Sequence, residues 1–114
     1  MRKITSVLLS LFLMSCLITS ANAVVTFGAT SCGTWVANKS KNEADGWASI
    51  IDHYWLMGYL GGLATYSNAD VLKDRDSNSI FLWVDNYCQI NPLKNSADAG
   101  IDLFLELKKQ KGLK

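Results

Sequence analysis

Two cysteines constrain this chain more than any other feature, because they follow a segment typical of an export signal. The segment has a positively charged start and a short apolar run, and residues 21–23 (Ala-Asn-Ala) match a signal peptidase site. Cleavage after Ala23 leaves Cys32 and Cys88 as an even pair outside the cytoplasm, where disulfides persist. We therefore predict a disulfide between them, which closes a loop of about 57 residues and stabilises a small domain.

The same leader leaves a second processing route open. Residues 13–16 resemble a lipoprotein box that ends in Cys16, so lipidation of Cys16 is the alternative to simple cleavage after Ala23. The apolar run is too short for a membrane-spanning helix and has the wrong flanks. We expect a signal peptide over residues 1–23, one domain over residues 24–114, and a periplasmic or secreted protein.

The composition excludes several classes of protein. Hydrophobic residues make up 49% of the chain and charged residues 18%, which excludes a disordered or low-complexity chain. After cleavage, nine basic residues stand against ten acidic ones, so no basic field is available to hold a nucleic acid. No cofactor motif is present, and zinc has no suitable combination of cysteine and histidine.

The apolar spacing predicts four helices and no strand, and hence an all-α, disulfide-stapled single domain. The polar residues expected to begin the helices are Thr30 or Ser31, a capping box at 40–43, Ser77 or Ser79, and Asn91 followed by Pro92. A polar surface loop is expected between the second and third helices.

Each helix has an expected core face. These faces are Cys32, Trp35 and Val36; Ala44, Trp47, Ile51, Tyr54, Gly58 and Gly61, with Ala48, Trp55, Tyr59 and Gly62 beside them; Ile80, Trp83, Val84, Tyr87 and Cys88; and Leu93, Ala97, Ile101, Phe104 and Leu105. The second helix is apolar nearly all round, which places it in the middle of a bundle. A membrane span is the rival interpretation, but Asp52 and His53 interrupt the run.

Glycine and aromatic residues indicate a close contact. Each of Gly58, Gly61 and Gly62 destabilises a helix by about 1 kcal/mol relative to alanine, so we expect another helix, or a bound partner, to approach the backbone there. Eleven aromatic residues follow Ala23. Four thin helices can hardly bury all of them, so we expect at least one Trp or Tyr in a partly exposed apolar groove.

Two patterns suggest catalysis or metal binding. Ser49 lies four residues before His53, the spacing of a nucleophile and a base, but no third orienting group is present. We favour a structural role, with Asp52 and His53 as the polar seam of the helix.

Residues 74–85 have the spacing of a calcium loop, with Asp74, Asp76, Asn78 and Asp85 as ligands. Ser79 occupies the glycine position, so we favour a solvated acidic loop and no metal.

The early cysteine, the apolar helix with Gly58, Tyr59 and Gly61, and the second cysteine before Asn91-Pro92 carry a family resemblance. The chain resembles the HdeA-type periplasmic acid-stress chaperones and the type VI secretion immunity proteins. This resemblance implies a small HdeA-like helical fold and a role that depends on binding other proteins.

The expected function is that of a non-enzymatic periplasmic protein-binding factor, an immunity or inhibitor protein. The alternatives are an acid-stress chaperone that titrates Asp98, Asp102 and Glu106, and a hydrolase that uses Ser49 and His53. The expected partner is a toxin, an enzyme or an unfolded client, and a homodimer is also open. The residues expected to contact the partner are His53, Tyr54, Tyr59, Asp70, Asp74 and Asp76.

Overall fold

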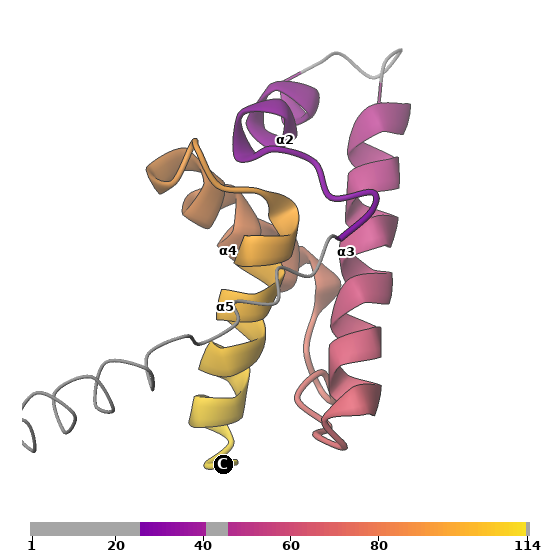
Figure 1. The fold of residues 1–114 in the computed structure, drawn as a ribbon, viewed down its shortest axis with the longest axis vertical. Coiled ribbons are helices and arrows are strands. Elements are labelled where there is room, and N and C mark those ends of the chain that lie inside the picture. The colour runs from indigo at the N-terminus through magenta and orange to yellow at the C-terminus, as the bar shows by residue number, and fades with distance from the viewer. Residues whose placement is uncertain (1–25, 41–45, 114) are drawn as a thin grey trace, which may run out of the picture.

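Within residues 26–40 and 46–113, which the computed structural model describes, the chain folds into four α-helices and has no strand beyond a single bridge between Ser31 and Asn95 (Figure 1). The helices are α2 (Cys32–Lys39), α3 (Trp47–Tyr66), α4 (Ser77–Ile90) and α5 (Ser96–Gln110). The all-α prediction with four helices is confirmed. The expected leader and most of the expected capping box at 40–43 lie outside the described residues.

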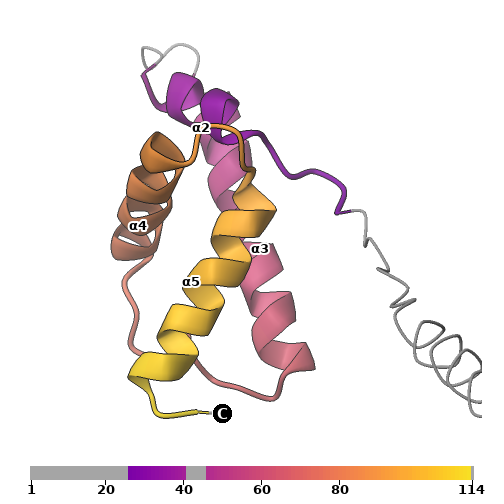
Figure 2. The same cartoon turned by 60° about the vertical axis from the view of Figure 1, so that its left-hand side comes forward.

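α5 runs beside α3, and α2 lies across one end of α3 and α4 (Figures 1 and 2). α5 packs against both α3 and α4. The buried residues that form the core are Cys32, Trp35, Leu56, Leu60, Ala69, Val71, Ile80, Val84, Cys88, Ala99, Leu103, Phe104 and Leu107.

The two cysteines meet in this core. Cys32 in the first turn of α2 and Cys88 in the last turn of α4 are both buried, and their Sγ atoms lie 2.10 Å apart at disulfide-bonding distance. The predicted pairing is therefore confirmed in space. It joins two cysteines that lie 56 positions apart in the sequence, so it closes most of the described chain into one loop.

The segment before α2 is fixed at both of its ends. Ser31 caps α2 by accepting from the Thr34 amide at 3.1 Å, as predicted, and the Thr30 carbonyl accepts from the Ser96 amide at 2.8 Å. Further back, Trp55 Nε1 donates to the Phe27 carbonyl at 2.9 Å. Gly28 is required beside it, because its φ is +81° and a Cβ would lie 2.5 Å from Trp55 Nε1.

The predicted core face of α3 is wrong at most of its positions, although Trp55 packs against the core as expected. The buried residues are Leu56 and Leu60, whereas Trp47, Ile51 and Tyr54 are 73%, 64% and 77% exposed. The helix lies at the side of the bundle and not in its middle, so only one of its apolar sides meets the core. Its start also differs, because Ser40 ends α2 and Gly46 is the N-cap of α3.

The explanation expected for the three glycines within the fold is also wrong. Among the described residues, a Cβ added at Gly58, Gly61 or Gly62 would find no neighbouring atom within 4 Å. The close helix contact lies instead at Gly100 of α5, where a Cβ would stand 2.9 Å from Tyr59 Cδ1. No helix of the bundle therefore requires glycine on α3.

The connection between α3 and α4 is tied to the core more firmly than expected. Val71 is fully buried and Ala69 nearly so, which anchors a loop predicted to lie on the surface. Asp76, and not Ser77 or Ser79, caps α4 by accepting from the Ser79 amide at 3.0 Å. The predicted inner stripe of α4 is confirmed, with Ile80, Val84 and Cys88 buried and Trp83 and Tyr87 packed against them.

The predicted start of α5 at Asn91 and Pro92 is wrong. Asn91 ends α4 by donating its amide to the Tyr87 carbonyl, and α5 begins after Asn95, which forms a reciprocal capping box with Asp98. The later start changes the buried face to Ser96, Ala97, Ala99, Gly100, Leu103, Phe104 and Leu107. Of the predicted core residues, Ala97 and Phe104 are buried as expected, whereas Leu93, Ile101 and Leu105 are 99%, 42% and 56% exposed.

No helix in the described part of the chain combines the length and the apolar character that crossing a membrane requires.

Candidate functional site

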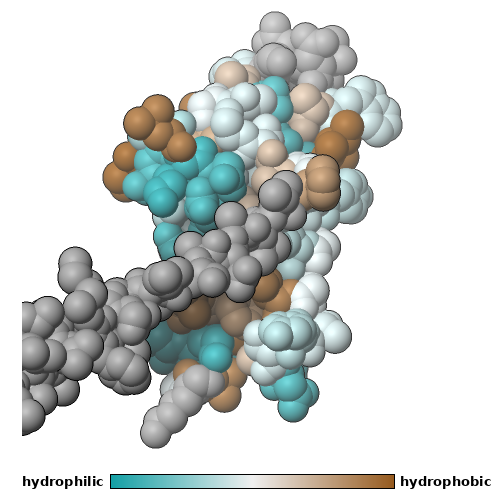
Figure 3. Space-filling view, in the orientation of Figure 1, coloured by the Kyte–Doolittle hydropathy of each residue, from teal (hydrophilic) through white to brown (hydrophobic). Residues whose placement is uncertain are grey.

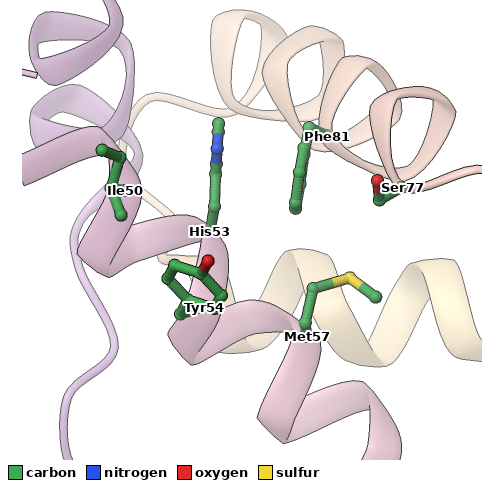
Figure 4. Close-up of a pocket in the computed structure, with 6 residues that line it drawn as sticks. All are labelled: Ile50, His53, Tyr54, Met57, Ser77 and Phe81. Carbon is green, nitrogen blue, oxygen red and sulfur yellow. The ribbon is translucent and has the colours of Figure 1, made fainter.

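An apolar pocket of about 360 Å³ opens between α3 and α4 (Figure 4). Four residues from α3 and two from α4 line it: Ile50, His53, Tyr54, Met57, Ser77 and Phe81. The spacing Ile50, His53, Tyr54, Met57 follows one side of a helix, which explains why a single segment supplies most of the wall. The volume lies at the small end of the range for ligand pockets.

His53 forms the aromatic wall of the pocket together with Phe81. The two rings stack with centroids 3.8 Å apart and planes 5° from parallel, as Figure 4 shows, and Trp35 packs against His53 at 5.4 Å. Burial lowers the pKa of His53 below its usual value, although the Asp85 and Asp52 carboxylates act in the opposite direction. The imidazole is therefore neutral at neutral pH and presents an apolar face.

A buried carboxylate holds the wall from behind. Asp85 of α4 is 5% exposed, accepts a hydrogen bond from Trp35 Nε1 at 2.7 Å and pairs with Lys39. Asn38 of α2 donates to Asp52 of α3 at 2.8 Å. These contacts connect α2 to both helices that form the pocket. Because Asp85 already accepts from Trp35 and pairs with Lys39, it is not placed to serve as the last ligand of the calcium loop considered above.

The structure brings together only two of the six residues expected to contact a partner. His53 and Tyr54 line the pocket, whereas Tyr59 stacks on Trp55 at 5.0 Å and packs near Gly100.

The expected acidic residues lie elsewhere. Asp70 borders a separate cavity of about 310 Å³ near the end of α3, Asp76 caps α4 beside Ser77, and Asp74 is in the exposed loop. None of these three residues is among those that line the pocket, and Asp76 serves as the N-cap of α4.

Sequence reasoning missed Ile50, Met57, Ser77 and Phe81. Ile50 and Met57 share a helix side with Tyr54, a spacing that could have indicated them once Tyr54 was selected. Phe81 follows Ile80 in the sequence but does not belong to the inner stripe of α4. A large apolar residue outside the core stripe of a helix is a signal that could have indicated it.

The structure does not bring the side chains of the two chemical patterns together in the described residues. No hydrogen bond joins Ser49 to His53, whose ring is packed between Trp35 and Phe81. Across residues 26–40 and 46–113, no three His, Cys, Asp or Glu side chains are grouped so that they could hold a metal ion.

Exposed apolar residues continue from the pocket along the N-terminal half of α3. Trp47 and Ile51 stand beside Ile50 and Tyr54 on the helix, and all four are exposed. Figure 3 shows apolar surface beside this part of α3. This confirms the expectation that at least one Trp or Tyr would lie in a partly exposed apolar region.

Compared with protein-family models, with curated proteins and with solved structures, the chain matches none of them.

Proposed function

We propose that this chain is an exported, non-enzymatic protein-binding factor that acts as an immunity or inhibitor protein. The observation that carries the proposal is the open apolar pocket between α3 and α4. It offers the apolar side chains of Ile50, Met57 and Phe81 and three groups able to hydrogen bond, the His53 imidazole and the hydroxyls of Tyr54 and Ser77. A protruding apolar side chain of a partner protein matches both its size and its chemistry, and such anchors dominate the energy of protein interfaces.

The rigidity of the walls supports this role. Phe81 and His53 stack on each other, and the Asp85 contacts fix α2 and α4 behind them. A pocket that is formed before the partner arrives does not have to be ordered during binding, which favours affinity. In this proposal the chain reaches the periplasm after cleavage at Ala23. There it binds a toxin or an enzyme and blocks the activity of that partner.

The direct test places a photo-crosslinking phenylalanine analogue at position 81 in the exporting cell, with position 82 as the matched control. Leu82 is 57% exposed and is not among the residues that line the pocket. We expect one discrete adduct from position 81 and none from position 82. Equal labelling at both positions, or no adduct at position 81, would contradict the proposal.

The purified partner then tests the inhibitor role. We expect it to lose its activity when this chain binds, and we expect Phe81→Ala to weaken binding by about tenfold or more. Leu82→Ala is expected to bind as the wild type does. A partner that binds with its activity unchanged would remove the inhibitor role but keep the binding role.

An acid-stress chaperone is the second candidate, because the exposed apolar residues of α3 could hold an unfolded client. The expected acid-sensing residues are engaged in the fold. Asp98 accepts from the Asn95 amide at 3.2 Å and Glu106 accepts from Gln110 at 3.1 Å. Burial, together with the neighbouring Asp102 carboxylate, raises the pKa of Tyr87 to about 12.

The chaperone role predicts that the chain suppresses aggregation of a model client at about pH 3 and not at neutral pH. No suppression at the acidic pH would eliminate it.

A further inference from the structure

α3 has an outer face that the bundle leaves uncovered. We define this outer face of α3 as Trp47, Ile50, Ile51, Tyr54, Gly58, Gly61, Gly62 and Thr65. With 3.6 residues per turn these positions share one side of the helix, opposite the buried Leu56 and Leu60. We propose that this face packs against the same face of a second copy of the chain, with the two α3 helices antiparallel.

The order of residues along the face is complementary to itself. Its N-terminal half carries large apolar side chains and its C-terminal half carries small ones. A two-fold axis at the height of position 56 brings each large residue of one copy level with a small residue of the other. The level pairs are Trp47 with Thr65, Ile50 with Gly62, Ile51 with Gly61, and Tyr54 with Gly58.

The glycines supply the second argument. Glycine inside a helix is destabilising relative to alanine, yet no atom of residues 26–40 and 46–113 lies within 4 Å of a Cβ added at Gly58, Gly61 or Gly62. The isolated fold therefore offers no packing reason for them. In the antiparallel pair they give room for the large side chains of the second copy and let the two backbones approach.

Polar groups on the face do not oppose the contact. The hydroxyl of Thr65 already donates to the Gly61 carbonyl of its own helix at 2.9 Å. No residue of the face carries a charge, so two copies meet without like-charge repulsion. Such a surface pairs with another apolar surface more readily than with a charged one.

The exposed area is adequate for a modest dimer. Trp47 and Tyr54 are 73% and 77% exposed, which amounts to about 300 Å² at roughly 200 Å² for each aromatic side chain. Ile50 and Ile51, at 43% and 64%, add roughly 100 Å². Two copies together would bury about 800 Å², half of the ~1,600 Å² of a standard interface, so we expect a weak and reversible dimer.

Self-association is separable from capture of a partner in the pocket. Ile50 and Tyr54 belong to both surfaces, whereas Trp47, Ile51 and the glycines belong only to the outer face, and Met57, Ser77 and Phe81 only to the pocket. Variants of Trp47 therefore test the dimer, and variants of Phe81 test the pocket. Either proposal can fail while the other holds.

Sedimentation equilibrium of the purified protein is the first experiment. We expect a reversible dimer that Trp47→Ala weakens by about tenfold and that the control Leu82→Ala, which removes an exposed side chain from α4, leaves unchanged. A wild-type chain that stays monomeric up to millimolar concentration would overturn the proposal and would leave the outer face to a different protein.

Disulfide crosslinking then tests the orientation. Oxidation of a mixture of Trp47→Cys and Thr65→Cys chains is expected to join one to the other, because these positions are level in the antiparallel pair. Each variant alone is expected to crosslink poorly, since 18 positions at 1.5 Å each separate its two copies by about 27 Å. Efficient crosslinking of each variant with itself, and no product in the mixture that joins one variant to the other, would indicate parallel helices and overturn the proposed pairing.

Discussion

The two apolar sides of α3 have opposite surroundings. Leu56 and Leu60 on the inner side are fully buried against the other helices, whereas Trp47, Ile51 and Tyr54 on the outer side are mostly exposed. The residues on the two sides are similarly apolar, so hydrophobicity alone does not decide which side meets the core. The difference teaches that a helix that is apolar nearly all round can still lie at the edge of its bundle, with only one of its sides in the core.

Truncation of one residue on each side should give the largest contrast. Leu60→Ala is expected to lower the free energy of unfolding by about 2–5 kcal/mol, because it removes a fully buried side chain. Trp47→Ala is expected to change it by no more than about 0.5 kcal/mol in the monomer. Urea denaturation at low protein concentration measures both, and equal losses would contradict the assignment of the two sides.

Removal of the Cys32–Cys88 pair measures how much the disulfide contributes to the stability of the core that the inner side of α3 contacts. The double variant Cys32→Ser and Cys88→Ser is expected to lose about 4 kcal/mol of stability, from the entropy of closing a loop with a separation of 56 positions. Thermal unfolding with and without reductant measures the effect. Two free thiols in the oxidised wild-type protein, detected by mass spectrometry, would rule out this explanation.

Alanine at two glycines should act in opposite directions. Gly100→Ala, where a Cβ would stand 2.9 Å from Tyr59, is expected to lower the unfolding free energy by about 1–3 kcal/mol. Gly61→Ala, which meets no atom within 4 Å, is expected to raise it by up to about 1 kcal/mol in the monomer. Changes of the same sign in chemical denaturation would count against the contrast between an inner and an outer glycine.

His53 lies between the two sides of α3, and its protonation should have the smallest effect on the stability of the fold. Its pKa is lowered in the fold by burial, so the folded state binds the proton less readily than the unfolded chain does. Its contribution to stability is present above the unfolded pKa of about 6.5 and is lost as the pH falls from there to the folded pKa. We expect the wild type to lose stability on acidification through this range, relative to His53→Gln. A gain would show that Asp85 and Asp52 outweigh burial.

The sequence was sufficient for the parts of the fold that depend on local signals. The cap at Ser31, the inner stripe of α4 and the approach of Cys32 to Cys88 followed from spacing and residue type. The start of α5 did not, because Asn91 and Asn95 both resemble caps and only Asn95 has a carboxylate three positions later that bonds back to it.

The candidate site was harder to predict, because it depends on which side of α3 faces α4. His53 and Tyr54 were selected from the apolar helix, but their neighbour Phe81 comes from a helix that starts more than twenty positions later. Since α3 is apolar on nearly every side, its own sequence does not indicate which side of the helix faces the core. That rotation is set by packing against α5, where Gly100 admits Tyr59.

The central claim is that the outer side of α3 is a surface for a second copy. The most direct test is the dimer dissociation constant of the Gly58→Ala, Gly61→Ala double variant. Sedimentation equilibrium beside the wild type is expected to show dissociation at least about tenfold easier in the variant, because two methyl groups hold the helices apart. A variant that associates as tightly as the wild type, or more tightly, would contradict the claim.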